Sequence, residues 1–231
     1  MPDATLDTLE RAPLFKDLSR GALSEIAAAA RTREVAPGQP FFREGEPAAA
    51  FFVVRRGSVK LTQLGPDGHL VLLRLSGPGD AFGGVAALGQ DTYPVSAEAV
   101  DQVTALEWSG RAMQALMERH AGLAMNIGRF IASRLQALQV QYRQLATENV
   151  ERRVARAILR LVQHAGRRVE TGVLIDLPLS REDIAQMTGT TLFTVSRIIS
   201  RWESEGLLEA GRQRLVIRKP HALVSIAEEL S

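Results

Sequence analysis

The sequence contains no cysteine, which excludes disulfide bonds, thiol catalysis and any zinc or iron–sulfur site with cysteine ligands. No apolar run reaches the roughly 20 residues that a membrane-spanning helix needs. The first residues, MPDATLDTLERAPLF, have neither a basic region nor an apolar core, so they predict no secretory signal. With 45% hydrophobic and 23% charged residues, the composition is that of a globular protein, which we expect in the cytoplasm without membrane contact.

A large net charge is also lacking. The formal net charge is +2; residues 1–149 carry 15 Lys+Arg and 16 Asp+Glu, whereas residues 150–231 carry 13 and 10. Lys219 is the only lysine of the second part, where arginine supplies the other positive charges. Arginine suits bidentate contacts to phosphates and bases, although a GC-rich genome produces the same preference. The charge alone is therefore weak evidence for nucleic-acid binding.

Glycine and apolar spacing divide the chain into segments. Residues 1–32 predict helices, with Ser19 as an N-cap. From Val35 to Trp108, short apolar runs alternate with glycine turns, which indicates an antiparallel barrel or roll. Asp67-Gly68, between VKLTQL and LVLLRL, predicts a tight hairpin. From Arg111 to Gly166 glycine almost disappears, and we expect a long helix there.

An apolar stripe follows the expected long helix. Its members alternate at intervals of four and three residues, as a and d positions of a coiled coil do. The pattern favours two chains packed in parallel along the stripe, and the alternative is a stripe that packs on its own domain. Asn149 continues the spacing and is a candidate for setting the register. The stripe consists of Ile131, Leu135, Leu138, Tyr142 and Leu145.

Residues 180–204 contain two short helical patterns around a glycine. Ser180 and Asp183 predict a capping box, and Gly189 suits a left-handed helix end. Thr191 is placed to cap the second helix, whose apolar face begins at Val195. The small residue, the glycine and the apolar positions have the spacing of a helix-turn-helix. The alternative is a solvated helix hairpin.

The outward face of the second helix carries residues that suit base edges. Arginine forms two hydrogen bonds to guanine, serine serves several bases, and phenylalanine packs on the thymine methyl. The predicted base-reading residues are Phe193, Ser196, Arg197 and Ser200.

Contacts to the DNA backbone are predicted at the helix starts and beyond the second helix. The stretch GLLEAGRQRLVIR indicates two strands around Ala210-Gly211, as in a wing. The predicted backbone-contacting residues are Ser180, Arg181, Thr191, Arg201, Arg212 and Arg214.

The chain resembles the Crp/Fnr superfamily of bacterial transcription regulators over nearly its full length. The resemblance rests on LFKDLS, PGQPFFREGEPA, FFVVRRGSVKL, GDAFGG, the long helix and PLSREDIAQMTGTTLFTVSRIISRWESEGLL. It implies an α+β fold with a cyclic-nucleotide-binding-like β-roll (a jelly roll) at 1–110, a dimerisation helix at 111–148 and a winged helix-turn-helix at 149–231. It also implies a homodimer that binds palindromic sites in double-stranded DNA and acts with RNA polymerase, as an activator or a repressor.

The resemblance breaks down at the positions that would contact an effector. Members that bind cyclic AMP have a glutamate after the glycine of FGE and an arginine on the following strand. Here Gly84 takes the first position, the second falls near Tyr93, and residues 75–110 contain no arginine. The candidate residues for an effector pocket are Phe82, Gly83, Gly84, Val85, Tyr93, Val95 and Ser96.

Other cofactors have little support. The lack of cysteine excludes the iron–sulfur cluster of oxygen-sensing members. Haem stays open, because the TTLFTVSR helix resembles that of nitrogen-oxide regulators, some of which are thought to use haem. The histidines are nevertheless far apart in sequence and are expected at the surface or at helix ends. They are His69, His120, His164 and His221.

The reading helix also departs from the Fnr pattern. Members of that type have a glutamate three residues before the serine of E-x-x-S-R, where this chain has Phe193. We therefore expect a different half-site, unless Phe193 folds back onto Leu192 or the wing.

Three other functions compete with that of an effector-controlled DNA-binding regulator. A dimer that binds DNA constitutively, with a vestigial effector pocket, stays open. A signalling module that controls an enzyme or channel does not explain the helix-turn-helix. An enzyme has little support, because the sequence has no P-loop, no Ser/His/Asp set and no H-E-x-x-H motif.

We predict no tight binding of cyclic AMP, because a buried phosphate without a cationic partner is costly in free energy. Titration calorimetry of the purified protein with cyclic AMP should give no saturable heat. A micromolar affinity would contradict the prediction.

Overall fold

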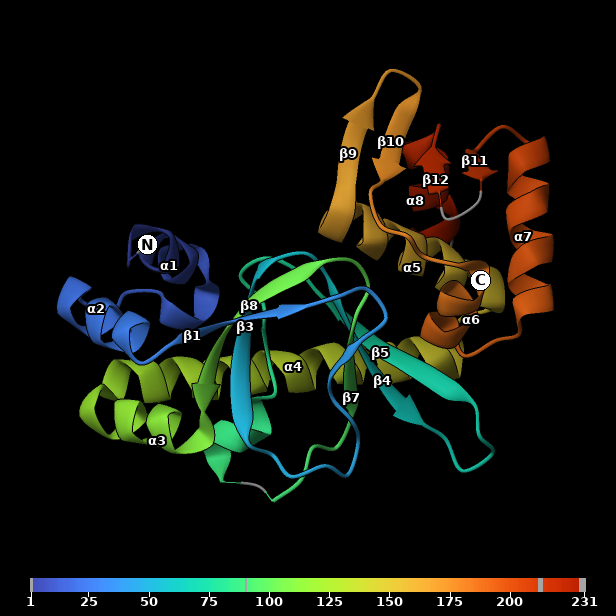
Figure 1. Ribbon diagram of the computed structural model, residues 1–231. Helices are drawn as coiled ribbons and strands as arrows, with labels where there is room; N and C mark the ends of the chain where they lie inside the picture. Colours follow the sequence, from blue (N-terminus) through green and yellow to red (C-terminus); the bar gives the residue numbers. More distant parts are fainter. Residues whose placement is uncertain (1, 90, 212–213, 229–231) are drawn as a thin grey trace. The chain divides into compact units, whose positions relative to one another are not determined.

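The computed structural model describes residues 2–89, 91–211 and 214–228, without the side chains of residues 2, 3, 85 and 87 (Figure 1). These form two compact units, one of residues 1–64 and 74–137 and one of residues 65–73 and 138–231.

The glycine-rich part forms two antiparallel sheets, as a β-roll requires. Their strand orders are β1-β8-β3-β6 and β2-β7-β4-β5. The hairpin at Asp67-Gly68 is confirmed: Gly65 N–H donates to the His69 carbonyl at 2.8 Å, and Gly68 has a φ of 80°. The strands are β1 (Arg31–Val35), β2 (Pro40–Phe42), β3 (Ala50–Arg56), β4 (Val59–Leu64), β5 (Leu70–Ser76), β6 (Ala81–Phe82), β7 (Ser96–Ala99) and β8 (Val103–Ser109).

The interior of the roll is filled by aromatic side chains. Phe42 stacks on Tyr93 with ring centroids 3.6 Å apart, and Phe52 stacks on Phe82 at 4.9 Å. Phe41 meets Phe52 and Phe82 edge-on. The close-packed rings make this face of the roll a dry core.

The N-terminal helices α1 (Pro2–Arg11) and α2 (Arg20–Ala28), with the 3₁₀ turn Pro13–Phe15 between them, cover a second core. Ser19 caps α2 as predicted, since its hydroxyl accepts from the Ala22 N–H at 3.2 Å. Buried Trp108 donates its indole N–H to the Ile26 carbonyl at 2.8 Å, which ties α2 to β8.

The expected single helix at 111–148 is two helices, α3 (Gly110–Arg119) and α4 (Ala121–Thr147). His120 separates them with φ −123° and ψ 87°, and its ring nitrogen lies 2.6 Å from a Glu25 carboxylate oxygen. The interpretation of Asn149 as a register residue is wrong. Asn149 lies beyond α4, and its side chain caps α5 (Val150–Ala165) by accepting from the Arg152 N–H at 2.9 Å.

The second unit contains one hairpin that the sequence analysis missed. β9 (Gly166–Val169) and β10 (Gly172–Ile175) join the wing strands β11 (Leu208–Gly211) and β12 (Arg214–Ile217) in a sheet of order β11-β12-β10-β9 (Figure 1). Gly172 has a φ of 141°, and a Cβ there would lie 2.1 Å from the Ile217 carbonyl oxygen, so the hairpin needs glycine. The remaining helices are α6 (Arg181–Thr188), α7 (Leu192–Ser204) and α8 (Pro220–Glu228).

Among the described residues, no helix is both long enough and apolar enough to cross a membrane.

Candidate nucleic-acid interface

The helix-turn-helix forms with the caps that the sequence predicted. Ser180 and Asp183 make both hydrogen bonds of a capping box at the start of α6. Gly189 ends α6 in the left-handed conformation, with φ 59° and ψ 47°. Two residues later, Thr191 caps α7 by accepting from the Thr194 N–H at 3.2 Å.

One arginine ties this turn to the rest of its unit. Arg153 of α5 donates to the Thr188 carbonyl at 3.0 Å and to the Glu148 carbonyl at 2.7 Å. The same side chain thereby satisfies carbonyls at the end of α6 and just beyond α4, which otherwise lack helical partners.

Helix α7 has a buried side and an exposed side. Val195, Ile198 and Trp202 are buried as predicted, together with Ile199. Arg197 and Ser200 are exposed, and Ser196 is partly exposed. The four predicted base-reading residues therefore lie on the face that α7 leaves open to a partner.

Phe193 is strongly exposed, with 75% of its surface accessible, and the neighbouring Leu192 is 47% exposed. The alternative in which Phe193 folds back onto Leu192 is therefore wrong. An exposed phenyl ring at the start of a reading helix is available to contact an apolar group such as the thymine methyl.

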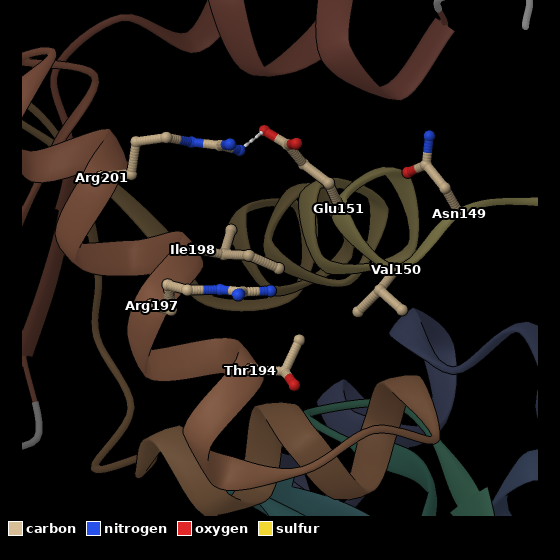
Figure 2. Close-up of a pocket in the computed structure, with 7 residues that line it drawn as sticks. All are labelled: Asn149, Val150, Glu151, Thr194, Arg197, Ile198 and Arg201. Carbon is tan, nitrogen blue, oxygen red and sulfur yellow. Dashed lines mark ion pairs between the residues drawn. The ribbon is translucent and has the colours of Figure 1, made fainter.

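A groove of about 490 Å³ lies between α7 and the first turn of α5. Arg197 and Arg201 extend from α7 toward that turn, where Arg201 meets Glu151 (Figure 2). An exposed helix start attracts anions through its free N–H groups. The lining residues are Asn149, Val150, Glu151, Thr194, Arg197, Ile198 and Arg201.

Glu151 binds two residues of α7 at once. The indole N–H of Trp202 donates to its Oε1 at 3.0 Å, and the Arg201 guanidinium pairs with the same carboxylate. The hydrogen bond to Glu151 raises the pKa of Arg201, so Arg201 is fully charged at neutral pH. Glu205 lies 3.9 Å from Arg201 and adds a weaker pairing.

The other predicted backbone contacts are unevenly available. Arg181 pairs with Glu203 at 3.5 Å, and the Ser180 hydroxyl donates to Asp183 at 2.6 Å. Arg214 is exposed on β12, while Arg212 lies outside the described residues. Among the described residues, Arg197 makes no ion pair or side-chain hydrogen bond and is free to bind a ligand.

Glu151 and the start of α5 were not predicted from the sequence. The sequence nevertheless carries a signal for this helix start, because asparagine followed two residues later by an acid is typical of a capped helix start. Because Asn149 also continues the spacing of the apolar stripe, the sequence favours a continuous helix through this residue over a helix start.

In the roll, several predicted effector residues serve the core. Phe82 and Tyr93 are buried in the aromatic cluster. The Tyr93 hydroxyl donates to the Ala50 carbonyl at 2.7 Å and accepts from the Ala50 N–H at 2.9 Å, and burial raises its pKa. A Cβ at Gly83 would lie 2.8 Å from the Ala50 carbonyl oxygen.

The remaining effector candidates differ in their surroundings. The Ser96 hydroxyl accepts from the Glu44 N–H at 3.0 Å. Val95 is partly buried, and a Cβ at Gly84 would meet no atom within 4 Å. The side chain of Val85 lies outside the described part.

The apolar stripe is exposed along α4. Its five residues are 44–75% accessible, with Tyr142 the most exposed. Near its end, Leu145 lies beside the turn of the helix-turn-helix, since a Cβ at Gly189 would be 3.1 Å from its side chain.

Within the described residues, no three His, Asp or Glu side chains are grouped so as to hold a metal ion.

Two family models match the chain. The cyclic nucleotide-binding domain matches residues 32–120, and the Crp-like helix-turn-helix domain matches residues 152–226.

Relatives and solved structures match nearly the whole length. "Probable transcriptional regulator flp" of Lacticaseibacillus casei is 30% identical over 202 residues, which cover 87% of this chain and 90% of that protein. The cyclic AMP receptor protein of Thermus thermophilus is 27% identical and covers 95% and 98%. The structure of TTHB099, a CRP-family transcriptional regulator of Thermus thermophilus, superposes with a TM-score of 0.75 at 26% identity, covering 85% and 97%.

The exposed helix α7 and the neighbouring β11–β12 hairpin agree with the two family models. The relatives also match along almost their whole length. The chain therefore belongs to the Crp/Fnr family of DNA-binding transcription regulators.

Proposed function

We propose that the protein acts as a homodimer that binds a palindromic promoter site and controls transcription together with RNA polymerase. Residues 1–110 form its sensor domain, 111–148 its dimerisation region and 149–231 its DNA-binding domain. The observation that carries the proposal is the exposed face of α7, on which Phe193, Arg197 and Ser200 lie opposite a buried apolar face.

Dimerisation is supported by the exposed stripe of α4. Apolar residues at alternating intervals of four and three form the seam of a coiled coil. Covering them by a second copy would bury apolar surface and stabilise the pair. A symmetric dimer would place its two α7 helices about one DNA turn, roughly 34 Å, apart.

The proposed control is a population shift. An effector that binds one arrangement of the dimer more tightly increases the fraction of dimers that can bind DNA. Cyclic AMP does not suit this role, because the place of the phosphate-binding arginine falls near Tyr93, whose hydroxyl is hydrogen-bonded to the main chain of Ala50. The filled aromatic interior also supports the second candidate, a dimer that binds DNA without any effector.

Arg197→Ala should weaken binding to the preferred site by about 1–3 kcal/mol and relax selectivity at one base pair, because the bidentate contact to guanine is lost. The measurement is a set of dissociation constants for duplexes that vary at each position. Arg214→Ala is the control, since a phosphate contact weakens all duplexes alike. If Arg197→Ala also weakened them all equally, Arg197 would have no base-reading role.

Glu151→Gln should tighten DNA binding by about 2–5-fold and steepen the salt dependence by about one phosphate contact, because it releases Arg201 and removes a negative charge. Glutamine keeps an acceptor for the Trp202 indole, so the fold is preserved. Glu205→Gln, at the weaker partner of Arg201, should have a smaller effect. Unchanged affinity and salt slope for Glu151→Gln would show that Arg201 does not contact DNA.

Leu138→Glu should split the dimer, because it places two carboxylates on the apolar seam. Sedimentation velocity of the variant should give a monomer. The matched control is Val140→Glu, which lies on the same helix, is similarly exposed but falls off the stripe, and should stay dimeric. An unchanged sedimentation coefficient for Leu138→Glu would place the interface elsewhere.

A further inference from the structure

Two arginines flank one aromatic ring where β5 and α4 meet in the first unit. The Arg134 guanidinium carbon lies 4.7 Å from the centroid of the Phe130 ring, and that of Arg74 lies 6.0 Å away. Asp80 is the acid in this cluster, with one carboxylate oxygen 3.6 Å from Arg134. Its other oxygen accepts from the Gly77 N–H at 3.0 Å and so belongs to the turn after β5.

The cluster contains buried donors without acceptors. Arg74 uses Nη2 to donate to the Ala81 carbonyl at 2.8 Å. Its Nη1 and the Nε of Arg134 are buried and have no hydrogen-bond partner among the described residues. Ser76 is fully buried, and its hydroxyl also has no partner among them. Ser76 lies two residues after Arg74, on the same face of β5.

Positive charge exceeds negative charge in this cluster. Burial, together with the nearby charge of Arg134, lowers the pKa of Arg74 to about 10. Burial also lowers the pKa of Arg134. Arg74 is mostly buried and Arg134 is partly exposed, and the carboxylate of Asp80 lies near both charges.

Such an arrangement is costly unless something compensates it. A buried charged donor without an acceptor keeps the full free-energy cost of its desolvation, and two nearby cations repel each other. Arg153 illustrates the usual solution, because it donates to two main-chain carbonyls. Among the described residues, Arg152 also has a buried nitrogen without a hydrogen-bond partner. At Arg74, a second arginine and a buried serine on the same strand accompany such a nitrogen.

We propose that Arg74 and Arg134 bind the oxyanion group, a carboxylate or phosphate, of a small effector, with Ser76 as an additional donor. Guanidinium groups pair with such oxyanions through two parallel hydrogen bonds, and an anion here supplies the missing acceptors and balances the charge.

The position links the sensor to the dimer seam, and in this respect the inference rests on the proposed function. Arg134 is one residue before Leu135 and three after Ile131, both members of the stripe on α4. Arg74 belongs to a strand of the roll. An anion held by both residues therefore ties β5 to α4, so its binding can favour one arrangement of the paired helices.

The test is titration calorimetry of the full-length protein with inorganic phosphate and, separately, with succinate, in a chloride buffer of constant ionic strength. We expect saturable binding of at least one anion. Binding of phosphate alone would identify a phosphoryl group as the ligand, and binding of succinate alone would identify a carboxylate.

Arg134→Gln should weaken the affinity for the bound anion at least tenfold. Arg134→Lys should weaken that affinity less, because lysine keeps the charge but loses the bidentate geometry. Arg143→Gln, an exposed arginine of the same helix, is the matched control and should change the affinity less than twofold.

Absence of saturable binding of both anions at millimolar concentration would overturn the inference, as would equal affinities of Arg134→Gln and the unsubstituted protein. Circular dichroism verifies that each variant is folded. Duplex binding by the unsubstituted protein is measured in parallel. If the protein binds a DNA duplex but no anion, only this inference is wrong. If it binds an anion but no duplex, the proposed function as a DNA-binding regulator is wrong.

Discussion

The DNA-binding unit depends on how Trp202 is held. Trp202 is a fully buried residue of α7, and its indole N–H donates to the Glu151 carboxylate at the first turn of α5. This hydrogen bond fixes the rotation of α7 about its axis, so that Val195 and Ile198 face inward while Phe193, Arg197 and Ser200 face outward. Because the same carboxylate also pairs with Arg201, the residue that orients the helix also reduces the positive charge beside it.

The roll has the family fold but a different interior. Stacked rings and the two hydrogen bonds of the Tyr93 hydroxyl fill the region in which the resemblance places a phosphate-binding arginine. Buried guanidinium nitrogens without a hydrogen-bond partner among the described residues are instead found at Arg74 and Arg134, on a strand and a helix of the same unit.

Local signals in the sequence predicted the helix-turn-helix of the second unit. The capping box at Ser180, the left-handed Gly189 and the Thr191 cap depend on neighbouring residues, so their spacing was sufficient. The β9–β10 hairpin was missed because its strands are only four residues long and the identity of Gly172 is dictated by the distant Ile217 carbonyl. The pairing of Arg201 with Glu151 joins residues 50 positions apart, and no local pattern reveals it. The break at His120 likewise involves Glu25 of a different helix.

The central claim is that two copies of the chain place the exposed face of α7 in successive major grooves. Selection of binding sites from random duplexes with the purified full-length protein, without added effector and then with the anions named above, tests it most directly. The account predicts enrichment of a palindrome whose half-sites are centred about one helical turn apart. Failure to enrich any sequence under either condition, or enrichment of single half-sites without symmetry, would contradict it.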